Sequence, residues 1–340
     1  MDDKFKRKRE IVLYAVDEYI KTAQPITSGG LNAHFKDISS ATIRNELNAL
    51  ESMGYFKQLH TSGGRVPTTL AYKEYVNSLL TNNKLNYDSI KQVIETYEDR
   101  SVSLISTLST LAKRLSKATN CPAVLVQHGL KNLLIQNIQI IPLINKDALL
   151  LVETNAGIID DNLTLDPNIT RSACVEASDY LSRHFAGKTI GFMVDNITDV
   201  TLTAGTQMLK FRELISSVAD SLMSVIKTRC DVSNENPTRL LSGLNQSEIS
   251  EAKEIFDLLQ DKDSMIDLVD TESENLNFTM GEDKDNRLKG GMMMSAPIVV
   301  NGVPIASLAL VGPKRIDYAC VAAALKFIVG QIDSGGESEK

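Results

Sequence analysis

The stretch ISSATIRNELNALESMGYFKQLHTSGGRVPT at positions 38–68 constrains the fold more than any other part of the chain. Ser39 or Ser40 can cap a helix, because a serine oxygen accepts a hydrogen bond from a free amide of the first helical turn. Gly54 suits the position just beyond the helix, where a left-handed backbone is common. Between these signals, apolar side chains recur at helical spacing, at Ile43, Leu47 and Leu50. The sequence therefore predicts one short helix with defined ends.

A hairpin is expected directly after this helix. A strand is predicted over 55–60 and its return over 65–68, around a tip in which Gly63 and Gly64 allow a tight turn and a close approach to phosphate. Apolar periodicity predicts earlier helices over 4–22 and 28–35, and a later one over 69–80. Three helices followed by a hairpin indicate a winged helix-turn-helix, in which the third helix enters the major groove of DNA.

The face of the third helix opposite its apolar row is polar. Arginine favours guanine and asparagine favours adenine in the major groove, so Arg44 and Asn45 are the first candidates for reading bases. Arg65, at the base of the hairpin tip, could contact phosphate or enter the minor groove. The complete candidate DNA-binding set is Ser39, Ser40, Thr42, Arg44, Asn45, Asn48, Thr61, Ser62, Gly63, Gly64 and Arg65. A polar helix face is also typical of a solvated surface, so a protein-interaction module with an inert head stays open.

Charge is distributed unevenly along the chain. Residues 1–80 carry 11 Lys and Arg against 9 Asp and Glu, whereas the remainder carries 25 against 34. A mildly basic head on an acidic body suits a protein that touches a polyanion at one end only. The basic run from Lys4 to Arg9 is either a solvated terminus or a phosphate clamp.

The body is expected to be an antiparallel α+β structure. β-branched runs and turn signals predict strands, and Asn301-Gly302 favours a type I′ hairpin. A polar loop is expected over 270–289. The helical segment 206–229 is either a core helix or a subunit interface. The predicted strands are 123–127, 133–143, 148–154, 157–165, 292–300 and 303–311, and the predicted helices are 87–118, 206–229 and 318–332.

Two regions of the chain, one near each end, resemble a known family. SSATIRNELNALESMGY, HTSGGRVPT and AYKEYV in the head, with NGVPIASLALVGPKRIDYACV near the C-terminus, are similar to the HrcA family of heat-inducible transcription repressors. The resemblance implies a homodimer that binds double-stranded DNA at an inverted-repeat operator of chaperone operons and depends on the GroEL chaperonin. It also implies a GAF-like α+β domain with an inserted dimerising region.

The resemblance therefore implies three parts in four segments: a winged helix DNA-binding domain at 1–82, a GAF-like domain at 87–190 and 256–340, and the dimerising region at 191–255. The sequence departs from the family at Gly30, where a basic residue is common. Together with Gly29, this glycine should loosen the start of its helix.

No catalytic constellation is visible in the sequence. The four histidines are scattered, the four cysteines form no CxxC pair and suit buried thiols, and no phosphate-binding glycine loop is present. Met292 to Met294 suit a buried strand better than a soft-metal site. No apolar run is long enough to span a membrane and no signal core is present, so we expect a cytoplasmic protein that is not an enzyme and needs no metal or cofactor. The alternative is a transcription regulator that senses a small molecule through its GAF-like domain.

Overall fold

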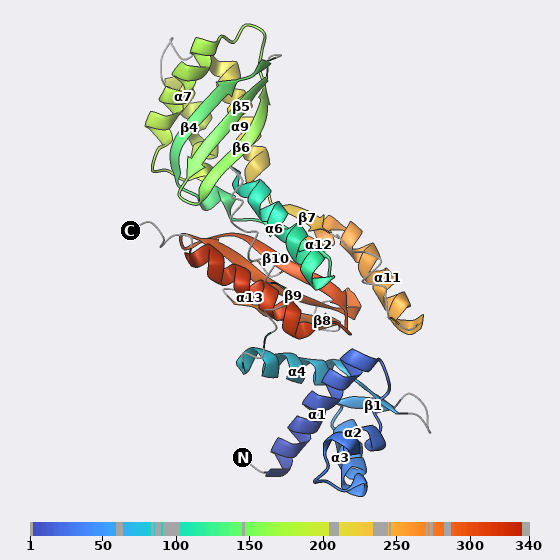
Figure 1. Cartoon of the computed structure of the whole chain (residues 1–340). Helices are drawn as coiled ribbons and strands as arrows, with labels where there is room; N and C mark the ends of the chain where they lie inside the picture. Colours follow the sequence, from blue (N-terminus) through green and yellow to red (C-terminus); the bar gives the residue numbers. More distant parts are fainter. Residues whose placement is uncertain are drawn as a thin grey trace.

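The computed structural model shows a mixed α/β protein with antiparallel sheets, built in three parts (Figure 1). A helical head lies at one end, a five-stranded sheet occupies the middle, and a three-stranded sheet with its own helices lies at the other end. The α+β class with antiparallel pairing is therefore confirmed. The structure describes residues 3–58, 64–82, 85, 90, 103–144, 147–203, 211–233, 244, 246–269, 271, 275–281 and 287–334.

The head consists of four helices and a two-stranded hairpin. In chain order they are α1 (Asp3–Thr22), α2 (Ser28–His34), α3 (Ser40–Ser52), β1 (Phe56–Gln58), β2 (Arg65–Pro67) and α4 (Thr69–Thr81). The apolar faces of the helices meet in a shared core that includes Ile11, Val16, Ile43, Leu47 and Phe56, all at most 2% exposed. The helix boundaries agree closely with the periodicity of the sequence. Of the predicted hairpin strands, 59–60 lie outside the described residues.

The ends of α3 are held by the local signals that the sequence predicts. The Ser39 hydroxyl accepts from the Thr42 amide at 3.1 Å, which is an N-cap. At the other end Gly54 has φ +83°, its amide donates to the Glu51 carbonyl at 2.9 Å, and the Tyr55 amide donates to the Leu50 carbonyl at 3.0 Å. These paired bonds form a Schellman motif, so the chain stops the helix and turns directly into β1.

The middle part is a five-stranded antiparallel sheet in the order β7-β3-β10-β9-β8. Its strands are β3 (Ala123–Gln127), β7 (Arg229–Ser233), β8 (Asn277–Gly281), β9 (Leu288–Val300) and β10 (Val303–Pro313). Two pairs of helices cover it: α6 (Leu104–Thr119) with α13 (Tyr318–Ser334), and α11 (Gln246–Gln260) with α12 (Lys262–Leu268).

Alternating side chains of the strands serve these two helical layers. Met292 and Met294 belong to the core shared with α6 and α13, whereas Met293 belongs to the core shared with α11 and α12. All three methionines are at most 1% exposed, which confirms the expected buried strand. Asn301 and Gly302 have φ of 49° and 77°, as a type I′ turn between β9 and β10 requires.

The third part contains a three-stranded antiparallel sheet in the order β4-β5-β6. Its elements are a short turn η2 (Leu130–Asn132), β4 (Ile135–Pro142), β5 (Asp147–Thr154), β6 (Gly157–Thr164), α7 (Arg171–Phe185), α8 (Ile190–Thr203) and α9 (Arg212–Ile226). Helix α7 packs on β4 and α9 on β6. This part leaves the five-stranded sheet after β3 and returns to it at β7.

Several expectations need correction or fall outside the described residues. The polar stretch 270–289 was expected to be a loop, but it contains the strand β8 (Asn277–Gly281), which pairs with β9 and has Met280 buried. Of the predicted helix 206–229, residues 206–210 lie outside the described residues, α9 spans Arg212–Ile226, and Arg229 already belongs to the strand β7. Of the predicted helix 87–118, the structure describes residues 90 and 103 and the helix α6, which begins at Leu104. The range 191–255 contributes α8 and α9 to one sheet and β7 and α11 to the other, so its dimerising role stays a prediction.

Two glycines of the head should respond oppositely to alanine. A methyl group at Gly29 or Gly54 would meet nothing within 4 Å, so only the backbone distinguishes them. Gly29 lies inside α2, and Gly29→Ala should raise the free energy of unfolding by about 0.5–1 kcal/mol. Gly54 has a left-handed backbone, and Gly54→Ala should lower it by about 1–2 kcal/mol. Urea denaturation of both variants measures the effects, and equal signs would contradict the assigned backbone conformations.

Candidate nucleic-acid interface

The outward face of α3 presents a small set of polar groups. Ser40, Arg44 and Asn45 are exposed, and within the described part of the chain their side chains make no hydrogen bond or ion pair. They lie on the first two turns of the helix, where Asn45 is opposite the buried row of Ile43 and Leu47 and Ser40 and Arg44 flank that row. The structure thus leaves all three candidates exposed to solvent at the start of α3.

Two other candidates on α3 are occupied with the start of the helix itself. The Ser39 Oγ atom accepts from the Thr42 amide and lies 2.9 Å from the Thr42 Oγ1 atom. These hydroxyls therefore satisfy each other and the first turn of α3. Their contribution to the surface is to fix where the helix begins, which in turn orients Ser40, Arg44 and Asn45.

Arg65 lies against α3 instead of extending into solvent. Its Nε atom donates to the Glu51 Oε2 atom at 2.7 Å, and its Nη2 atom donates to the Asn48 Oδ1 atom at 2.6 Å. Its side chain is only 15% exposed. The Arg65 backbone also pairs with Ile26 in both directions, at 2.7 and 2.9 Å. One residue thus ties the hairpin to α3 and to the segment before α2.

Gly64 serves the same junction. A β-carbon at this position would lie 2.6 Å from the Pro25 Cβ atom and 2.9 Å from the Ile26 carbonyl oxygen. The hairpin base can approach the segment Pro25-Ile26 only because residue 64 has no side chain. The other tip candidates, Thr61, Ser62 and Gly63, lie outside the described residues.

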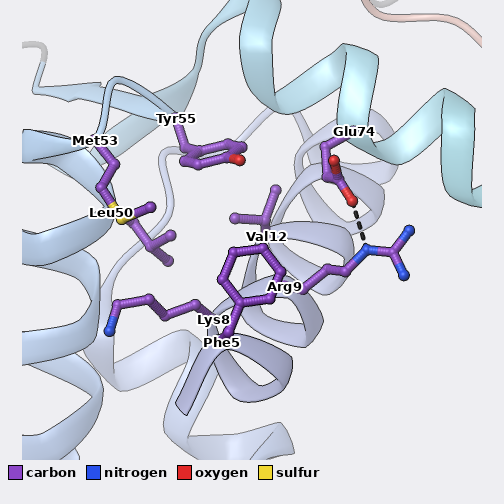
Figure 2. Close-up of a pocket in the computed structure, with 8 residues that line it drawn as sticks. All are labelled: Phe5, Lys8, Arg9, Val12, Leu50, Met53, Tyr55 and Glu74. Atoms are coloured by element: carbon purple, nitrogen blue, oxygen red, sulfur yellow. Dashed lines mark hydrogen bonds and ion pairs between the residues drawn. The ribbon is translucent and has the colours of Figure 1, made fainter. Parts of the chain in front are cut away.

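Part of the basic run near the N-terminus is used for packing inside the head. Lys8 pairs with Glu46 of α3 at 2.9 Å, and Arg9 pairs with Glu74 of α4 at 2.5 Å. Figure 2 shows the second pair beside a shallow apolar pocket between α1, α3 and α4. The pocket is lined by Phe5, Lys8, Arg9, Val12, Leu50, Met53, Tyr55 and Glu74. These two cations join helices, which accounts for part of the run without invoking phosphate.

The connection between Arg65, Asn48 and Glu51 was missed by sequence reasoning. Asn48 and Glu51 are three residues apart on a helix, which places them on one face, and that spacing was the available signal. The return of the hairpin to this face depends on β1 and β2, whose pairing aligns Gln58 with Arg65.

The described part of the chain contains neither a metal-ligand cluster nor a helix suited to a membrane. Its His, Cys, Asp and Glu side chains form no group of three that could hold a metal ion. None of its helices combines the length and apolarity that crossing a membrane requires. All four cysteines are buried thiols, as expected, and burial raises the pKa of Cys121 to about 12.

Comparison with known proteins identifies relatives over almost the full length. A family model described as the HrcA protein C terminal domain matches residues 105–321. A protein of Clostridioides difficile (strain 630) named heat-inducible transcription repressor HrcA is 31% identical over 332 residues, covering 95% of this chain and 97% of that protein. A protein of the same name from Acetivibrio thermocellus is 27% identical over 333 residues, covering 95% and 93%.

One solved structure has the same overall fold. It is described as a hypothetical protein at 2.2 Å resolution, has a TM-score of 0.66 and 20% sequence identity, and covers 98% of both chains. At this identity the likeness shows the fold alone.

The ion pair that joins the hairpin to α3 should contribute measurably to stability. A double-mutant cycle of Arg65→Met and Glu51→Gln should give a favourable coupling of about 1 kcal/mol, because the arginine is largely shielded and charge-assisted hydrogen bonds are strong. Arg183 and Asp179 on α7 form a matched exposed pair at 4.0 Å, whose coupling should not exceed about 0.5 kcal/mol. Equal couplings in the two cycles would show that the hairpin is not held in this way.

Proposed function

The chain belongs to the HrcA family, whose members in the comparison are named heat-inducible transcription repressors, and from this membership we propose that it represses transcription by binding duplex DNA through its head. The observation that carries the proposal is the open polar face of α3, where Arg44 and Asn45 stand side by side in sequence with no partner in the described part of the chain. It acts by binding and not by catalysis.

The head supports a winged helix-turn-helix assignment. Helices α1 to α3 share one core, and the β1–β2 hairpin follows α3 directly through the Gly54 turn. In Figure 1, α3 lies at the end of the molecule that points away from both larger sheets, so a duplex can approach it without meeting the body. We assign α3 to the major groove and the hairpin to the flanking backbone.

Different side chains of the head have different roles in this proposal. Arg44 and Asn45 contact base edges, because their planar donor and acceptor groups match guanine and adenine. Ser40 and the hairpin tip, Thr61 to Gly64, contact phosphate. Arg65 and Asn48 hold the hairpin at a fixed angle to α3, so their effect on DNA is indirect.

A second copy of the chain completes the proposed binding unit. One short helix offers few base contacts, whereas two heads related by a twofold axis double them and match an inverted repeat. Residues 191–255 supply the dimer contact in this proposal. The middle sheet, with helices on both faces, supports a GAF-like scaffold that joins head and dimer contact.

The proposed control of repression is by heat and chaperonin, and it rests on family membership. Loss of the folded or dimeric state on heating reduces the fraction of competent protein, and refolding by GroEL restores it, which raises the apparent operator affinity. A footprint on the DNA upstream of the protein's own gene, with and without chaperonin, tests this circuit. A metabolite that stabilised the protein and changed operator binding would instead favour ligand sensing.

Arg44→Ala should weaken binding to the operator by about 1–3 kcal/mol and relax base preference in each half-site, because a bidentate base contact is lost. Arg171→Ala is the matched control, since Arg171 is an exposed arginine on α7, outside both the head and the proposed dimer contact. Gel-shift titration on the operator and on single-base variants measures both effects. If Arg44→Ala binds like the control at every base, α3 does not read the operator through this residue.

A further inference from the structure

Arg315 connects the body to the head at a single side chain. Its Nε and Nη2 atoms donate to the two carboxylate oxygens of Glu248 on α11, at 2.9 and 3.1 Å. Its Nη1 atom donates to the carbonyl oxygen of Ile20 in the last turn of α1, at 3.4 Å. The side chains of Arg315 and Glu248 are 12% and 11% exposed. A shielded, bidentate ion pair therefore lies where the head meets the middle sheet.

The third contact of Arg315 uses a group that helix geometry leaves available. Ile20 is among the last four residues of α1, whose carbonyls have no partner further along the helix. A cation is favourable there because the helix end carries partial negative charge. Arg315 therefore links the end of α1 to α11, because the same guanidinium group is held by Glu248.

Aromatic rings form the apolar half of this junction. Tyr318, at the start of α13 and 1% exposed, lies 5.9 Å from Tyr72 and 6.3 Å from Tyr75, ring centre to ring centre, and both tyrosines belong to α4 of the head. The Tyr75 hydroxyl also donates to the Asp17 carboxylate of α1 at 3.0 Å. Helix α4 thus packs on α13 through buried rings, and the Tyr75–Asp17 hydrogen bond ties α1 to α4.

The position of Glu248 depends on the close packing of α11 against the strand β9 in the body. Gly290 on β9 has φ +80°, and a β-carbon there would lie 2.5 Å from the Glu251 side chain of α11. At Gly291 it would lie 2.9 Å from the Ile255 side chain. Both contacts allow α11 to lie directly on β9, which brings Glu248 to Arg315.

We propose that Arg315 is a positioning residue that fixes the direction of the DNA-binding head on the body and so sets the half-site spacing that the dimer accepts. The inference rests on the proposed function. The junction contacts α1 and α4 and leaves the exposed face of α3 uncovered (Figure 1). Such a junction can orient the head on the body without blocking the surface that is proposed to bind DNA. Two heads held rigidly match one separation along the duplex, whereas two loosely tethered heads reach several separations with weaker gain from bivalency.

The first test compares operators whose half-sites are separated by the native spacing or by about five extra base pairs, half a helical turn. Wild type should prefer the native spacing by about 100-fold or more, because only that spacing engages both rigid heads. Arg315→Ala should reduce this ratio to below about tenfold while a single half-site binds unchanged. Arg315→Lys, which retains charge but not the fork, should fall between them, and Arg183→Ala on α7 is the control. A wild-type ratio for Arg315→Ala, or tighter binding of this variant at native spacing, would overturn the inference.

The second test needs no DNA. Spin labels at Ser52→Cys on α3 and Lys253→Cys on α11 report the distance from head to body, and the four native cysteines are buried and should not compete. With labelled chain diluted in unlabelled chain, the wild-type distance distribution should be narrow and that of Arg315→Ala several-fold broader. If the distance distribution of Arg315→Ala is as narrow as that of wild type, Arg315 does not position the head, even if wild type binds operator. If wild type binds no operator while the two distance distributions differ as expected, the proposed function is wrong but the positioning role of Arg315 is supported.

Discussion

Burial of β10 on both faces is the constraint on which the arrangement of this chain depends. Every residue from Ile305 to Pro313 is buried, with β3 and β9 hydrogen-bonded on either side. Its side chains alternate between the helical layer of α6 and α13 and that of α11 and α12. This strand is held by neighbours on four sides, and it ends two residues before Arg315. The attachment point of the head therefore follows directly after a strand that is buried and paired on both edges.

Elements defined by local chemistry were predictable from the sequence, and elements defined by distant pairing were not. The cap at Ser39, the stop at Gly54 and the turn at Asn301-Gly302 each depend on a few consecutive residues. By contrast, β8 is a five-residue strand within a polar stretch, and it is stabilised by pairing with β9. Adjacent strands predicted between 123 and 165 also divide between two sheets. That division depends on β3 pairing with β7 and β10, which are more than a hundred residues away.

The same distinction applies to the candidate site. Helical periodicity correctly predicted that Arg44 and Asn45 face outward, because the buried row of α3 determines the opposite face. Arg65 was expected to contact phosphate or enter the minor groove, since it is a cation beside a glycine-rich tip. Its partners, Glu51 and Asn48, lie 14 and 17 residues earlier, and only the folded hairpin brings them together. Charge along a sequence cannot distinguish an arginine that faces a ligand from one that holds the site in shape.

The way the head uses its cations explains why its mounting matters. Lys8, Arg9, Lys21 and Arg65 all pair with carboxylates of the head itself, so their charges are partly neutralised before any duplex approaches. The glycines of α2 add no cation of their own. In the proposed complex, counterion release then supplies less affinity per head than a fully available basic surface would supply. The remaining contribution must come from base contacts made by a few side chains on α3, and two heads must make them at the same time. Simultaneous engagement depends on how rigidly each head is directed, which is the property that Arg315 and the tyrosines around Tyr318 control at the junction with the body.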